Sequence, residues 1–81
     1  MTMTDIEKTF FNACKHYNEC VAKNDDSSID ALNDLITATE DYKVKTGYDV
    51  KFVGDKDTQD TTGQHTIKRV DVIGRISYFQ F

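Results

Sequence analysis

The segment 54–65, GDKDTQDTTGQH, carries aspartates at alternating positions, a spacing found in calcium-binding loops. An EF-hand loop that began at Asp55 would need glycine at its sixth position and a bidentate glutamate at its twelfth. Those positions hold Asp60 and Thr66, so neither the sharp turn nor the clamping carboxylate is present. Aspartate, threonine and glycine are also the residues of an ordinary polar turn. The segment therefore predicts a hairpin connection between two strands and no metal site.

The soft and imidazole ligands of the chain are two cysteines and two histidines: Cys14, His16, Cys20 and His65. A tetrahedral zinc site would need all four, but around one helix Cys14 lies about 120° from Cys20 and about 160° from His16. The two cysteines are also about 9 Å apart along that helix, beyond the reach of a disulfide bridge. His16 and Cys20 could touch as a thiol–imidazole pair, but a helix C-terminus disfavours a thiolate. We therefore expect free buried thiols, no metal and no cofactor.

Sequence motifs for phosphate binding or nucleophilic catalysis are missing. The four glycines, Gly47, Gly54, Gly63 and Gly74, stand alone, as expected for turns and a helix cap. None belongs to a dinucleotide-binding fingerprint or a P-loop. The serines have no histidine and acid at a recognisable spacing. We expect a protein that is not an enzyme.

The whole chain has a formal net charge of −4, and its acidic residues concentrate in its first half. Between residues 19 and 41 there are seven acids and one base, whereas between residues 61 and 81 one acid faces three bases. This balance opposes general binding to a nucleic-acid backbone and favours a partner protein with a basic surface. The candidate partner-binding residues are Asp25, Asp26, Asp30, Asp34 and Asp41.

Two amphipathic helices are predicted to carry these acids. Thr4 and Glu7 have the spacing of a capping box, and apolar residues then recur at helical spacing to about Lys23. Turn-forming residues 24–28 follow, and a second helix begins near Ile29 and ends before Gly47, which suits a left-handed cap. Its opposite side is acidic. Its apolar side predicts packing against the first helix and consists of Ile29, Leu32, Leu35, Ile36, Thr39 and Tyr42.

The last third of the chain changes to the alternation of strands. Strands are predicted at residues 48–52, 66–73 and 75–81, and Gly74 marks either a turn or a bulge within one longer strand. We favour the turn. The expected fold is α+β, a single domain over residues 1–81. An N-terminal antiparallel helical hairpin packs on one face of a C-terminal two- or three-stranded antiparallel sheet, in the order α-α-β-β-β.

Two further surfaces follow from the strand residues. Tyr48, Lys68, Arg69 and Tyr78 could bind a nucleotide or another small ligand, between the helices and the sheet or across a dimer interface. The terminal segment 75–81 has apolar residues on both faces, which suggests a homodimer formed through this strand; alternatively, its last residue is covered by the helical hairpin. The candidate interface residues are Ile76, Tyr78, Phe79 and Phe81.

The sequence therefore predicts a small acidic, non-catalytic protein-binding module. We expect an accessory or inhibitor protein that acts on a nucleic-acid-handling partner, with its acidic helix face imitating a nucleic-acid backbone. The alternative is a nucleotide-binding module. The N-terminal residues lead into a charged amphipathic stretch with no secretory signal, and no segment has the composition of a membrane span. We expect a cytoplasmic location, no membrane contact and no direct binding to nucleic acid.

Overall fold

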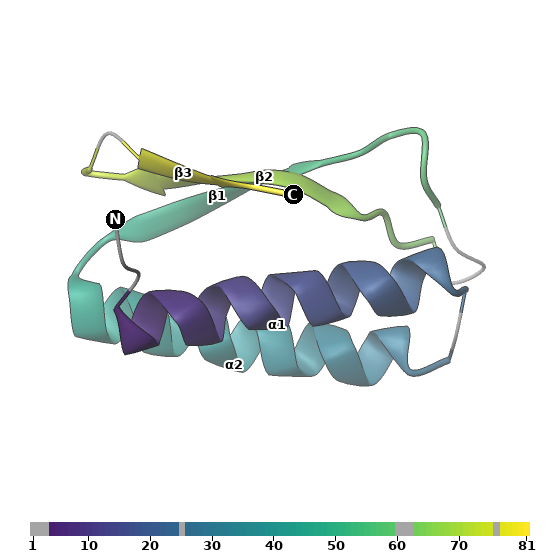
Figure 1. Ribbon diagram of the computed structural model, residues 1–81, viewed down its shortest axis with the longest axis horizontal. Helices are drawn as coiled ribbons and strands as arrows, with labels where there is room; N and C mark the ends of the chain where they lie inside the picture. Colours follow the sequence, from purple (N-terminus) through teal and green to yellow (C-terminus); the bar gives the residue numbers. More distant parts are fainter. Residues whose placement is uncertain (1–3, 25, 60–62, 76) are drawn as a thin grey trace.

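The two helices form one layer and the three strands form another (Figure 1). The structure is a computed structural model that describes residues 4–24, 26–59, 63–75 and 77–81. The elements in chain order are α1 (Asp5–Ala22), α2 (Ser28–Thr46), β1 (Asp49–Gly54), β2 (Ile67–Ile73) and β3 (Ser77–Gln80). The predicted α+β fold is confirmed: two helices precede a three-stranded antiparallel sheet and cover one of its faces.

Helix α1 begins with the predicted capping box. The Glu7 backbone N–H donates to the Thr4 hydroxyl oxygen at 3.4 Å, and the Thr4 N–H donates to the Glu7 carboxylate at 3.2 Å. The Thr4 hydroxyl also donates to this carboxylate at 2.8 Å. These hydrogen bonds, with a smaller contribution from Arg75, hold the pKa of Glu7 below its ordinary value. Arg75 follows strand β2 and lies 3.9 Å from Glu7, so the helix start is also tied to the sheet.

Helix α2 is anchored at both ends. Ser27, its N-cap residue, makes no side-chain capping bond, and its hydroxyl instead donates to the Cys20 sulfur of α1 at 3.4 Å. At the other end Gly47 adopts the predicted left-handed conformation, with φ of 76°, and its N–H donates to the Lys43 carbonyl at 2.8 Å. The start and the end of α2 are therefore set by local contacts before the sheet is reached.

The sheet has the order β1-β2-β3, with both pairs antiparallel. Gly74 has φ of 95° and lies in the turn between β2 and β3, so the predicted alternative of one long bulged strand is wrong. A bulge does occur elsewhere. Val53 pairs with Arg69 and Gly54 pairs with Ile67, which leaves Lys68 as the extra residue of β2.

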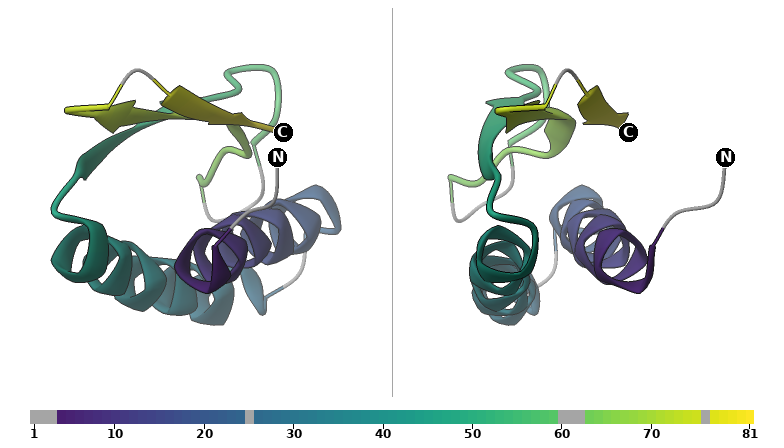
Figure 2. Two further views of the ribbon diagram at one scale, coloured as in Figure 1. Left: turned by 60° about the vertical axis from the view of Figure 1, so that its left-hand side comes forward. Right: turned by 90° about the vertical axis from the view of Figure 1, so that its left-hand side faces the viewer.

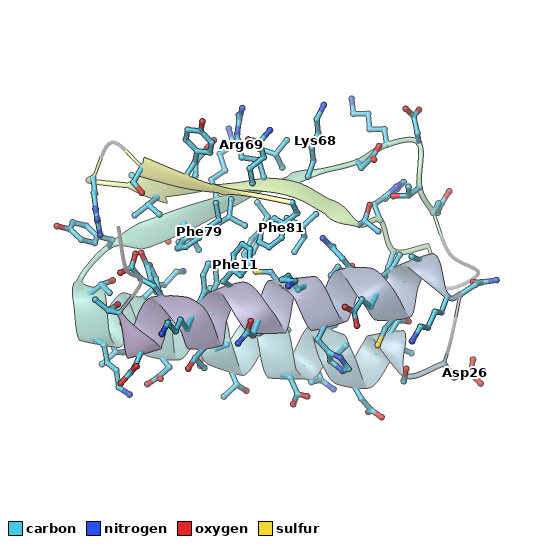
Figure 3. All side chains as sticks on the ribbon, in the orientation of Figure 1. Phe11, Asp26, Lys68, Arg69, Phe79 and Phe81 are labelled. Atoms are coloured by element: carbon cyan, nitrogen blue, oxygen red, sulfur yellow. The ribbon has the colours of Figure 1, made fainter. Side chains whose placement is uncertain are left out.

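Aromatic side chains join the two layers. Phe10 of α1 is fully buried, and its ring centroid lies 4.9 Å from Tyr42 of α2 and 5.5 Å from Phe79 of β3. On the neighbouring side of α1, Phe11 stacks on Phe81 with centroids 4.9 Å apart. Figure 3 shows the rings of Phe11, Phe79 and Phe81 between the sheet and the helices. In the end-on view of Figure 2, the β3 side of the sheet lies over α1 and the β1 side lies over α2.

Replacing Phe10→Ala is expected to destabilise the protein by about 3–5 kcal/mol, because it opens a cavity where three elements meet. Urea unfolding followed by circular dichroism would measure this loss, which is a large part of the stability of a domain of this size. The matched control is Val44→Ala, because Val44 is 83% exposed and its truncation should change stability by less than about 0.5 kcal/mol. Equal effects of the two substitutions would contradict the role given to Phe10.

Replacing Glu7→Gln is expected to lower stability by about 0.5–1 kcal/mol at pH 7, because the charged form is the one held by Thr4 and Arg75. The pKa of Glu7 is lower in the folded than in the unfolded protein, so this contribution is complete above the unfolded value. It is lost as the pH falls through the folded value. Unfolding free energies from pH 7 to pH 3 should therefore converge for the two proteins, and a constant difference would contradict this account.

Candidate functional site

The outward side of α2 carries exposed carboxylates along its N-terminal half. Asp30 and Asp34, one helical turn apart, are both exposed, and Asp26 is exposed just before the helix. Figure 3 shows the Asp26 side chain directed away from the body of the protein. None of these three forms an ion pair within the part of the chain that the structure describes. We call Asp26, Asp30 and Asp34 the acidic row.

The other two predicted partner-binding residues differ from the acidic row. Asp41 is partly buried, and its carboxylate lies 3.2 Å from the ammonium group of Lys45, one turn further along α2. Asp25 lies outside the described residues. Among the predicted partner-binding residues that the structure describes, those left without a cation therefore lie at the N-terminal end of α2.

A groove of about 480 Å³ lies beside α2, between this helix and the sheet. Its wall is mainly apolar and is formed by Leu32, Leu35, Ile36, Phe52 and Ile67. Phe52, on strand β1, is 40% exposed, and Ile36, on α2, is 49% exposed. The volume falls within the range of sites that hold small ligands or side chains of a partner.

Most polar side chains of the groove wall already have partners within the protein. The Tyr17 hydroxyl donates to the His65 carbonyl at 3.0 Å, and the Thr39 hydroxyl donates to the Leu35 carbonyl at 2.7 Å. The Lys43 ammonium lies 3.0 Å from the Asp49 carboxylate. Glu40 also lines the groove, is exposed, and forms no ion pair with any residue that the structure describes. The groove therefore presents to a ligand an apolar surface and the negative charge of Glu40, which has no cation among the described residues.

The predicted hairpin connection between β1 and β2 is confirmed, and the structure describes both of its ends. The Asp57 N–H donates to the Asp55 carboxylate at 3.0 Å, which forms an aspartate turn. The His65 Nδ1 lies 2.6 Å from the Thr58 carbonyl oxygen and 3.2 Å from that of Asp55. Because carbonyl oxygens only accept hydrogen bonds, Nδ1 carries a proton, and in the neutral ring Nε2 is left as the acceptor. His65 thus closes the connection and also forms part of the groove wall.

The cysteines and His16 lie away from this groove. Cys20 is buried, and its sulfur lies 3.8 Å from the His16 Nε2. Cys14 is fully buried, and loss of solvation raises the pKa of its thiol to about 12. Both thiols are free, as expected from their spacing. In the described ranges, no three histidine, cysteine or carboxylate side chains gather at one point where a metal could bind.

The residues predicted for a small ligand fall in two places. Lys68 and Arg69 lie together on the sheet face that is turned away from the helices (Figure 3). Tyr78, 61% exposed, lies on the adjacent strand β3, where it pairs with Asp71 of β2. Tyr48 instead packs at the edge of the core. None of the four lines the groove between helices and sheet.

The bulge in β2 explains the position of the two cations. Strict alternation would direct one of Lys68 and Arg69 toward the helices, where an unpaired cation is costly. The extra residue lets both point to solvent while Ile67 and Val70, on either side, are buried. The sequence pattern of two charges between two apolar residues is a signal from which the bulge could be predicted.

The predicted dimer-interface residues also divide. Phe79 is buried against Phe10, and Phe81 stacks on Phe11, so both rings contribute to the core of this chain. This position matches the predicted alternative in which the last residue is covered by the helical hairpin. Tyr78 faces solvent, and Ile76 lies outside the described residues. A dimer through β3 would therefore use its backbone edge and not the two phenylalanine rings.

The sequence did not predict the groove. Ile29 and Ile36 were expected on the buried side of α2, but they are 52% and 49% exposed. The buried side is narrower and is formed by Ser28, Ala31, Leu35, Thr39 and Tyr42. The reason is that the three-stranded sheet does not cover the outer flank of α2. The apolar arc of the helix is therefore wider than the surface that packs against it.

Comparison of the chain with protein-family models, with curated proteins and with solved structures finds no match in any of the three. Among the described residues, neither helix has both the length and the apolar character required to cross a membrane. The geometry of α2 and its surroundings is therefore what supports a functional proposal.

Proposed function

We propose that this protein binds another protein through the exposed side of α2 and has no catalytic role. The acidic row is the contact for basic side chains of the partner. The observation that carries this proposal is the pair Asp30 and Asp34, which are four residues apart, exposed, and without a cation in the described part of the chain.

Stability alone does not account for this pair. Asp30 lies in the first turn of α2, where the helix dipole favours a negative charge, and Asp26 lies just outside the same end. Asp34 is a full turn further in, beyond the reach of that effect, and it repels Asp30. A lysine at position 34 would pair with Asp30 in the favourable order. A residue that lowers stability on an exposed helix face is a reasonable candidate for a binding role.

Exposed apolar side chains on the flank of α2 beside Asp30 support an interface of ordinary composition. Ile29 and Ile36 are half-exposed, and they lie about a third of a turn around α2 from Asp30. Specific protein interfaces combine an apolar centre with a polar, solvated rim. Here the isoleucines would supply part of the centre, and the acidic row would supply the rim and steer a basic partner.

The charge of this surface suggests the class of the partner. Asp30 and Asp34 lie about 6 Å apart along the axis of α2, and Asp26 precedes them outside the helix, so a short line of negative charges runs along this end of α2. A protein that handles nucleic acid carries a basic surface that recognises such a line. The proposed role is therefore that of an accessory or inhibitor protein that occupies the basic surface of such a partner, in place of the nucleic acid.

Charge reversal at Asp30→Lys and Asp34→Lys is expected to reduce capture of the partner from a lysate of the source organism at least tenfold. Capture should also weaken with added salt, because exposed charges are screened. Quantitative mass spectrometry of the captured proteins would measure both effects. The matched control is Asp57→Lys, an exposed acid of the β1–β2 connection. The proposal fails if the double variant retains the same proteins as the wild type.

The single variant Asp34→Lys separates a binding role from a structural one. Its free energy of unfolding in urea should be unchanged or higher by a few tenths of a kcal/mol, because the substitution removes the repulsion between Asp30 and Asp34. If it instead unfolds the protein, Asp34 has a structural role that the described contacts do not show.

A second candidate function rests on the placement of Lys68, Arg69 and Tyr78 on the uncovered face of the sheet. Two cations could contact a phosphate group, and the exposed ring of Tyr78 could stack on a base. However, the Arg69 guanidinium already lies 2.8 Å from the Asp71 carboxylate, which reduces the charge available. For this reason the α2 surface is the first proposal.

A thermal-shift screen with nucleoside mono-, di- and triphosphates tests this second candidate. A ligand at a hundred times its Kd should stabilise the protein by about 2.7 kcal/mol, which is several degrees for a domain of this size. The shift should be lost in Lys68→Ala with Tyr78→Ala and retained in Lys56→Ala, which removes an exposed lysine in the β1–β2 connection. Unchanged melting with every nucleotide would eliminate the candidate.

A further inference from the structure

We infer that the groove between α2 and β1 binds an extended peptide segment of the partner, with an aliphatic or phenyl side chain in the groove and a lysine or arginine beside it. This inference rests on the proposed function, since it names the part of the partner that docks next to the acidic row. The proposed function is tested at Asp30 and Asp34, whereas this inference is tested at Ile36, Glu40 and the peptide backbone, so the two can be tested separately.

The shape and lining of the groove select an apolar side chain. Leu32, Ile36 and Phe52 are its accessible apolar walls, and its volume of about 480 Å³ exceeds that of one large side chain. Ile36 and Phe52 together leave apolar surface in water that burial under a peptide would remove. Most polar groups of the wall are already hydrogen-bonded within the protein, so a polar ligand would find few free donors or acceptors.

The edge of strand β1 selects an extended backbone. In the described sheet β1 pairs only with β2, so its other edge is open. The Val50 N–H donates to the side chain of its neighbour Asp49 at 2.8 Å and therefore points away from β2. Hydrogen-bonding direction alternates along a strand, so the N–H and C=O of Phe52 point the same way as those of Val50. A peptide added at this edge would pair with Phe52 next to the groove, in the manner of β-augmentation.

The charge around the groove selects a cation next to the apolar side chain. Glu40 is the acid of the groove wall that has no cation within the described residues, while Lys43 is held by Asp49. The acidic row continues the negative surface around α2. A lysine or arginine next to the buried side chain would reach Glu40, whereas an acidic residue would be repelled.

The same charges argue against a second copy of this chain as the occupant. The residues that would supply an added strand from another copy belong to a chain with a formal net charge of −4, and α2 of each copy carries the acidic row. Bringing two such surfaces together costs electrostatic energy, whereas a basic segment gains it.

A random dodecapeptide library displayed on phage and panned against the full-length protein tests the inference. The expected result is a consensus of one large apolar residue next to lysine or arginine. Fluorescence anisotropy of a synthetic consensus peptide would then give its Kd for each variant. We expect Ile36→Asn to weaken binding at least tenfold. Val44→Asn, a matched control on the same helix that is 83% exposed and outside the groove, should leave the Kd unchanged.

Two further measurements separate the parts of the inference. Glu40→Gln should raise the Kd of the consensus peptide several-fold. It should not change the Kd of a peptide whose lysine or arginine is replaced by glutamine. A single N-methyl group, placed at successive backbone positions of the peptide, should abolish binding at alternate positions only, because only alternate amides face the edge of β1. N-methylation that has the same effect at every position would overturn the extended, edge-paired geometry.

The outcomes distinguish this inference from the proposed function. If the consensus peptide binds equally to wild type and Ile36→Asn, or if panning yields no consensus, the groove inference is overturned, while lysate capture still decides the role of the acidic row. If Asp30→Lys with Asp34→Lys retains the partner but Ile36→Asn loses it, the proposed function fails and the groove stands. If sedimentation shows a dimer that Ile36→Asn dissociates, a second copy occupies the groove and the inference is overturned.

Discussion

The packing of Phe10 against Tyr42 and Phe79 is the contact on which the arrangement of the two layers depends. It joins α1, α2 and β3 at one fully buried point, and on the same side Phe11 and Phe81 close the space between α1 and the sheet. A three-stranded sheet positioned in this way over α1 is too narrow to cover the far flank of α2. The groove beside α2 is therefore a consequence of where the aromatic side chains gather, and not of a separate structural device.

The incomplete cover of α2 by the sheet also explains why the sequence predicted the fold better than the candidate site. The capping box, the glycine cap of α2 and the change to alternating strand residues are local signals, and each contributed to the predicted fold. The exposure of Ile36 depends on how many strands lie above α2, which is a tertiary property. Periodicity identifies an apolar arc on a helix, but it does not show how much of that arc a partner element covers.

Strand β2 departs from the strict alternation of inward and outward side chains. Lys68 and Arg69 follow each other in the chain, and a regular strand would have separated them onto opposite faces. The bulge in β2, opposite Val53 and Gly54, places both on the outer face and leaves Ile67 and Val70 in the core. Lys68 and Arg69 were predicted to bind a ligand, and their common face could be known only from the register of β1 and β2.

Several of the described carboxylates are paired with a cation of the protein, whereas Asp34 is not. The cation is Lys45 for Asp41, Lys43 for Asp49 and Arg69 for Asp71. Ion pairs exposed in this way add little to stability. Asp34 has no such partner, repels Asp30 and lies beyond the region where the helix dipole would favour it. The half-exposed isoleucines Ile29 and Ile36, which the sheet leaves uncovered, lie on another side of the same helix. The proposed contact with a basic, partly apolar surface of another protein therefore rests on two features of one helix, an uncompensated charge and an uncovered apolar flank.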